Sequence, residues 1–157
     1  MKLNHKSAIS ETIKMLQAAE KEKQRLQASG IILTGDFNAR LGMAHGGEES
    51  IIGPYSYGRT AVHKVELPNR DLLLEFCAGA GLLVANTFMN TAVEEKVTFR
   101  EPGTLPMAEV SPSSFNMLAL VLCDAAFLAR VERLHSVRAA ALPTDHFLVR
   151  CVANVPK

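Results

Sequence analysis

The stretch IILTGDFNARLG, residues 31–42, sets the pattern from which the fold is predicted. Residues 31–33 form a continuous apolar run, which is typical of a short strand buried on both faces. Asp36 and Asn38 follow within a few positions. Side chains two apart on an extended backbone point to the same side. We therefore expect a short, fully buried strand that leads into a polar pair able to hold one water molecule or one metal ion.

The segments on either side of this stretch predict alternating helices and strands. Apolar residues recur at helical spacing over 7–28, and a second amphipathic helix begins near Pro68 and ends at Gly79 or Gly81. A short helix capped by Asp124 is also expected. Apolar and β-branched runs predict strands over 82–88, 95–99, 117–123, 133–137 and 147–155. Because several strands follow one another without an intervening helix, the pattern favours an α/β fold with a mixed, partly antiparallel sheet.

Composition is that of one globular domain. The chain has 157 residues, of which 48% are hydrophobic and 21% charged, and this balance excludes a disordered chain. We expect residues 1–157 to form a single domain. The net charge of +1 supplies no electrostatic argument for a nucleic-acid partner, although a cleft can be basic locally.

The cysteines and the lengths of the apolar runs indicate where in the cell the protein is expected. Cys77, Cys123 and Cys151 are an odd number in apolar surroundings and lack metal-ligand spacing, so we expect buried, reduced thiols and an intracellular protein. Nucleus and cytoplasm are equally compatible with this pattern. No apolar run approaches the ~18 residues of a membrane span, so no membrane partner is expected.

A second polar motif precedes the last predicted strand, in PTDHFLV at residues 143–149. The carboxylate of Asp145 suits Mg²⁺, and the imidazole of His146 can donate a hydrogen bond to a phosphate oxygen. Each motif also has a structural explanation, since Gly-Asp-Phe-Asn is a plausible turn and Asp-His before a strand is a common cap. Their joint occurrence at strand termini favours a site.

Five segments together resemble the endonuclease/exonuclease/phosphatase superfamily, and most of all the endonuclease domain of non-LTR retrotransposons and the cellular proteins derived from it. The resemblance covers about residues 10–153, and its segments are TGDFNARLG (34–42), GPYSYGRT (53–60), LLEFC (73–77), LLVANTF (82–88) and PTDHFLV (143–149). It implies a four-layer α/β sandwich of two packed sheets flanked by helices. It also implies hydrolysis of phosphodiester or phosphomonoester bonds with Mg²⁺, or Mn²⁺ in its place, and DNA or another nucleic acid as the partner.

The resemblance assigns roles to individual residues. Asp36 would orient or deprotonate the attacking water, and Asn38 would steady that water. Asp145 would supply a carboxylate near the metal, and His146 would stabilise the charge on the phosphorane. These assignments fit the needs of in-line attack on phosphorus, which are a positioned water, a cation and donors aimed at the developing charge.

Two further residues are candidates for substrate contacts. Arg59 in the Tyr-Gly-Arg-Thr segment would touch backbone phosphates, or would be an ordinary surface arginine of a long loop over residues 42–66. Asn86 would face the same cleft, or would only cap the end of its strand.

Two departures from the family pattern predict impaired chemistry. Thirty residues precede Ile31, so the N-terminal half of the family domain, with its metal-binding glutamate, is expected to be missing. Ala119 occupies the position where the family carries an acid that supports the catalytic histidine. We therefore expect a truncated, partial sandwich that a partner chain completes, and an impaired Mg²⁺-dependent endonuclease-like hydrolase. The alternatives are a catalytically inactive retroelement-derived remnant or interaction module, and a small-molecule or lipid phosphatase.

Overall fold

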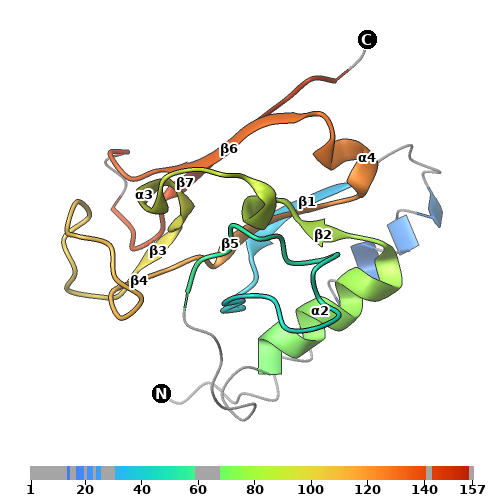
Figure 1. The fold of residues 1–157 in the computed structure, drawn as a ribbon, viewed down its shortest axis with the longest axis horizontal. Coiled ribbons are helices and arrows are strands. Elements are labelled where there is room, and N and C mark those ends of the chain that lie inside the picture. The colour runs from blue at the N-terminus through green and yellow to red at the C-terminus, as the bar shows by residue number, and fades with distance from the viewer. Residues whose placement is uncertain are drawn as a thin grey trace.

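The computed structural model describes residues 31–58, 68–140 and 143–155, together with residues 14, 17–19, 21–22 and 24–25, which are helical (Figure 1). The rest of the helix predicted over 7–28 lies outside the described residues. The elements are β1 (Ile32–Asp36), α2 (Pro68–Ala80), β2 (Leu83–Val84), the 3₁₀ helix η2 (Ala85–Phe88), α3 (Val93–Lys96), β3 (Phe99–Arg100), β4 (Phe115–Asn116), β5 (Ala119–Cys123), α4 (Ala125–Leu128), β6 (Val131–Val137) and β7 (Leu148–Ala153).

The described strands form small antiparallel sheets. One sheet has the strand order β1–β5–β2, and the pairs β3–β4 and β6–β7 form the others. Parallel pairing within the described ranges is limited to an isolated bridge between Ile52 and Val84. The predicted α/β class and the antiparallel pairing are therefore confirmed.

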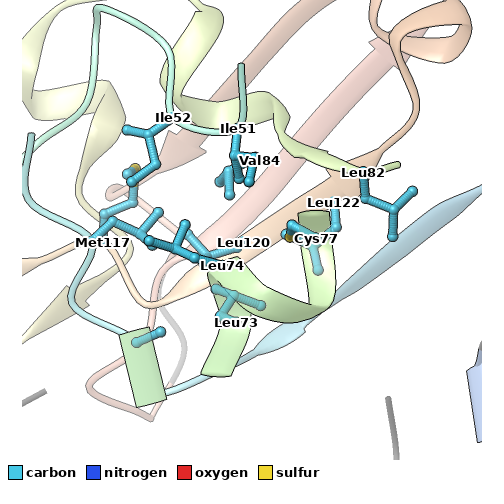
Figure 2. Close-up of a cluster of buried hydrophobic side chains, with 12 residues drawn as sticks. Ile51, Ile52, Leu73, Leu74, Cys77, Leu82, Val84, Met117, Leu120 and Leu122 are labelled. Atoms are coloured by element: carbon cyan, nitrogen blue, oxygen red, sulfur yellow. The ribbon is translucent and has the colours of Figure 1, made fainter. Parts of the chain in front are cut away.

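One face of the β1–β5–β2 sheet packs against α2 and the segment 39–52. Leu120 and Leu122 of β5 point to this face and meet Leu73 and Cys77 of α2, as Figure 2 shows. The other buried members of this cluster are Ala39, Leu41, Ile51, Ile52, Leu74, Leu82, Val84 and Met117. Removing such side chains from water is the main stabilising contribution to a fold of this size.

The other face of the same sheet packs against the β6–β7 pair. Val121 and Cys123 of β5 lie in a second cluster with Leu134 of β6, and Val149 and Cys151 of β7 pack against it. Successive side chains of β5 thus enter two different clusters, as the alternation of a strand requires. Figure 1 shows α2 and the β6–β7 pair on opposite sides of β5.

The prediction of a fully buried strand over 31–33 was wrong. β1 runs from Ile32 to Asp36 and lies at an edge of its sheet, where Ile32 is 42% exposed. Only alternate residues, Ile31, Leu33 and Phe37, pack against the α2-side cluster. The opposite face of β1 stays exposed because the second cluster covers β5 and β2 instead.

Two other predicted strands are shorter than expected. The segment 82–88 pairs with β5 only at Leu83 and Val84, and then turns into η2. Thr87 stabilises this turn, since its buried hydroxyl donates to the Val84 carbonyl and accepts from the backbone N–H of Gly53. In the segment 95–99, only Phe99 is in a strand, because residues 93–96 form α3.

Local signals for the helix boundaries are confirmed. α2 begins at Pro68, and Gly81 follows its last residue with a φ of 66°, a left-handed conformation that glycine adopts without strain. Asp124 caps α4 by accepting a hydrogen bond of 2.7 Å from the Phe127 N–H, and its other oxygen accepts from the Ile31 N–H. None of the described helices has the length and apolar character needed to cross a bilayer.

Candidate functional site

Asp36 is the last residue of β1 and faces Ala119 of β5 across the sheet. One carboxylate oxygen, Oδ1, accepts a hydrogen bond of 2.9 Å from the backbone N–H of Asn38. This is the local turn that an aspartate favours, in which its side chain binds the backbone two residues on. The structural explanation of the Gly-Asp-Phe-Asn motif therefore accounts for one oxygen of Asp36. It leaves the other oxygen, Oδ2, free of the turn.

His146 approaches that second oxygen from a distant part of the chain. Its Nε2 atom lies 3.6 Å from Oδ2 of Asp36, and both side chains are about one-third exposed, at 36% and 35%. The imidazole ring packs against Phe99, with 5.0 Å between ring centroids, and the backbones of these two residues form an isolated bridge. The two motifs that the sequence places far apart thus meet at one solvent-accessible point.

Asp145 does not face this point as a free carboxylate. Its Oδ1 atom lies 3.1 Å from Nη2 of Arg100, and its backbone carbonyl accepts a hydrogen bond from the Arg100 N–H. Arg100 also donates to the carbonyl groups of Thr104 and Thr144. Sequence reasoning missed Arg100, because no motif marks it and only the pairing of β3 with the segment before β7 brings it here.

Asn38 contributes its backbone to the turn and leaves its side chain exposed. Its φ is 49°, a left-handed conformation that asparagine tolerates better than most residues. Its carbonyl accepts a hydrogen bond of 3.2 Å from the side chain of Asn69 on α2. The Asn38 side chain forms no hydrogen bond with a described residue, so it is available to a water molecule or a substrate beside Asp36.

Of the two residues predicted to contact substrate, the structure describes only Asn86. Asn86 binds the part of β5 that β2 does not pair with: its Oδ1 accepts from the Val121 N–H at 2.7 Å, and its Nδ2 lies 3.5 Å from the Ala119 carbonyl. It thereby replaces the backbone of β2, which has already left the sheet. Arg59 lies outside the described residues.

Ala119 lies beside Asp36. Its cross-strand partner is Asp36, and cross-strand partners share a face, so its methyl group points to the side of Asp36 that faces His146. Its backbone N–H donates to the Thr98 hydroxyl. An acid at this position would stand next to Asp36 and within the neighbourhood of the imidazole.

The described residues do not form a preassembled magnesium site. No group of three or more histidine, cysteine, aspartate or glutamate side chains within the described ranges is arranged to hold a metal ion. Asp145 is engaged by Arg100, and Glu101, which follows β3, is bound by Arg40 at 2.8 Å and Asn116 at 2.9 Å. The chemistry that the geometry itself supports is that of the Asp36–His146 pair.

A pocket lies elsewhere on the molecule. It is lined by Ala129, Arg130, Val131, Glu132 and Asn154, at the start of β6 and just past the end of β7. His146 precedes β7, so the pocket is at the other end of that strand and is not part of the site.

No protein-family model matches the chain, and no curated protein matches it significantly. The resemblance to the endonuclease/exonuclease/phosphatase superfamily therefore stays a prediction from the motifs.

Proposed function

We propose that this chain is an impaired, endonuclease-like phosphodiester hydrolase related to the endonuclease domain of non-LTR retrotransposons, with a partial form of that sandwich fold. The observation that carries the proposal is the approach of His146 Nε2 to within 3.6 Å of Asp36 Oδ2. A turn explains Asp36 alone, and a cap explains His146 alone. Neither explains why the two side chains converge at a solvent-accessible point.

The pair supplies two of the functions that phosphodiester hydrolysis needs. The Asp36 carboxylate, held by the Asn38 N–H, is positioned to orient an attacking water and to accept its proton. His146 donates a hydrogen bond to a phosphate oxygen as negative charge develops there. The exposed Asn38 side chain holds the water in place. DNA is the proposed substrate.

Magnesium belongs to the proposal as a cofactor that arrives with the substrate. Mg²⁺ is commonly held by one or two carboxylates together with substrate phosphate oxygens and water. Asp36 is the described carboxylate that would contact it, and the ion would neutralise phosphate charge. Asp145 would join only after leaving Arg100.

We expect slow hydrolysis because of the residues that surround Asp36 and His146. Ala119 provides no carboxylate beside His146, and the loss of such a supporting group typically lowers activity ~10–100-fold. Among the described residues β1 is also an edge strand, and a partner chain that pairs with it would complete the sheet. The same two observations favour the second candidate, an inactive remnant that serves as an interaction module.

Nicking of supercoiled plasmid by the purified chain tests the proposal. With Mg²⁺ or Mn²⁺ we expect slow nicking that Asp36→Asn and His146→Gln each reduce about 10²-fold or more. Ala119→Asp should increase the rate about 10–100-fold, because it supplies the missing carboxylate. Asp71→Asn, on the exposed face of the first turn of α2, is the matched control and should nick like the wild type.

The alternatives predict other results. If every variant is folded by circular dichroism and none nicks DNA with either metal, the chain is an inactive remnant. If the wild type leaves plasmid intact but hydrolyses a small phosphomonoester in a manner that needs Asp36, it is a phosphatase.

A further inference from the structure

The outer edge of β1 is unpaired in the part of the chain that the structure describes. β1 is the last strand in the order β1–β5–β2, whereas the opposite edge of this sheet, at β2, is bridged by Ile52. Four of the five residues of β1 are exposed. An exposed strand edge is a template for a further strand, because its backbone donors and acceptors are directed at solvent.

Hydrogen bonds at the two ends of β1 fix which of its backbone groups point outward. The N–H groups of Ile31 and Phe37 both donate toward the β5 side, at 3.1 Å and 3.2 Å. The backbone groups of successive residues in a strand point to opposite edges, so the odd-numbered residues of this segment face β5. The backbone N–H and C=O groups of Ile32, Thr34 and Asp36 therefore point to the free edge.

β1 has none of the features that commonly protect a strand edge. Its sequence, ILTGD, contains no lysine or proline, and its pairing with β5 runs from Ile32 to Asp36 without the register shift that a bulge would cause. The second apolar cluster covers β5 and β2 instead of β1, so Ile32 remains 42% exposed. The edge is therefore accessible to another strand.

This edge is complementary to a second copy of itself. Thr34 is the middle one of the three outward residues, so a twofold axis beside it pairs Thr34 with Thr34 and Ile32 with Asp36. Each outward N–H then meets a carbonyl group of the other copy, which gives roughly six backbone hydrogen bonds. The two Asp36 carboxylates lie at opposite ends, about 13 Å apart along the strands, where salt screens their repulsion. A parallel pairing in register would place these carboxylates side by side.

We propose that this chain forms a symmetric dimer in which β1 pairs antiparallel with β1 of a second copy, centred on Thr34. The two three-stranded sheets become one continuous sheet, and the exposed Ile32 of each copy lies diagonally across from Thr34 of the other. The pairing uses backbone groups at the edge, so the Asp36 side chain keeps its direction toward His146. The inference therefore does not depend on the proposed hydrolase activity.

Sedimentation equilibrium at about 1–100 µM protein measures this association, because pairing of short strands buries little area and gives weak dimers. The mean mass of the wild type should rise with concentration from 17.1 kDa toward twice that value. Thr34→Pro removes the central outward N–H, which β5 does not use, and should remain a monomer. Thr34→Val keeps this N–H and the strand propensity, so as the matched control it should associate like the wild type.

Cross-linking tests the register, in a Cys151→Ser background that removes the one native thiol that is not buried. Thr34→Cys places a thiol on each side of the twofold axis, with Cα atoms about 5.5 Å apart, which a disulfide can span. Oxidation with copper phenanthroline should therefore give a covalent dimer. Ile32→Cys lies about 13 Å along the strands from its own copy and should stay monomeric under the same conditions.

Several results would overturn the inference. A wild type that is monomeric at the highest concentration would do so, as would a mass that rises well beyond that of a dimer. Undiminished association of Thr34→Pro, with the variant folded by circular dichroism, would place the interface elsewhere. Cross-linking of Ile32→Cys as efficient as that of Thr34→Cys would exclude the twofold pairing. If Thr34→Pro does not fold, the comparison of the two cysteine variants decides.

Discussion

Arg70 is a charged residue that is only 4% exposed, and its contacts hold the chain that follows the Asp36 turn. Its Nε donates to the Leu41 carbonyl at 2.7 Å, and its Nη1 donates to Glu48 at 2.9 Å. Breaking one side of such a buried pair is costly, because it leaves the other charge without a partner. At the scale of the residue, this pair connects α2 to the segment that follows the Asp36 turn.

The Glu48–Arg70 pair predicts a pH dependence of stability. The hydrogen bond from Arg70 lowers the pKa of Glu48 from 4.5 to about 2, against an opposing effect of burial. A carboxyl group with a lowered pKa in the folded state contributes stability that is complete above the unfolded value. We therefore expect this contribution to be present above about pH 4.5 and lost as the pH falls toward 2.

Urea denaturation of Glu48→Gln measures that contribution. At neutral pH the variant should lose about 2–3 kcal/mol of unfolding free energy, and the loss should shrink as acid removes the pair from the wild type. Glu49→Gln changes an exposed neighbouring acid and serves as the control. Equal stability of Glu48→Gln and the wild type at neutral pH would contradict the assignment.

At the scale of the element, η2 shows how β2 can end without leaving backbone hydrogen-bonding groups of β5 unpaired. β2 pairs with β5 over two residues only, and the Asn86 side chain then takes over at Val121 and Ala119. Gly53 is packed so closely against η2 that a Cβ atom there would lie 2.5 Å from the Thr87 carbonyl oxygen. Close backbone approach of this kind admits only glycine.

Asn86→Ala distinguishes the structural role of Asn86 from a role in substrate binding. The Val121 N–H would lose its acceptor in a part-buried position, so we expect a loss of about 1–3 kcal/mol of unfolding free energy. DNA affinity, measured by anisotropy on the folded fraction, should stay unchanged. A variant with wild-type stability and weakened DNA binding would instead place Asn86 in the substrate cleft.

At the scale of the whole molecule, β5 is shared by the two apolar clusters that flank its sheet. Leu120 and Leu122 serve the α2 side, and Val121 and Cys123 serve the β6–β7 side. α2 and the β6–β7 pair thus depend on one central strand. Loss of either cluster exposes apolar residues of the same strand, so we expect both to be lost together on unfolding.

Thiol reactivity reports on these clusters. Burial raises the pKa of Cys77 to about 12 and, with smaller effects of Asp124 and Cys151, that of Cys123 to about 12. Near pH 8 both thiols should therefore react with DTNB only when the chain unfolds, whereas the half-buried Cys151 should react first. Cys151→Ser should remove the first phase. Rapid modification of Cys77 in the native chain would show that the α2-side cluster is open.

Local structure could be predicted from residues that lie close together in the chain. The ends of α2 at Pro68 and Gly81 and the cap of α4 at Asp124 depend on residues close together in the chain, and the structure confirms them. Apolar runs likewise predicted β5, β6 and β7 to within a few residues. The polar motifs at residues 36–38 and 145–146 were visible because they interrupt such runs.

Pairings between distant segments could not be predicted from the sequence, because they depend on how the whole chain packs. Whether an apolar strand is central or at an edge depends on which neighbours it finds, so the exposure of β1 could not be inferred from residues 31–33. The engagement of Asp145 by Arg100 and the approach of His146 to Asp36 arise from pairings between β1, β3 and the segment before β7. The periodicity of apolar side chains predicts which residues of a strand share a face. The segment that this face packs against is set by the packing of the whole chain.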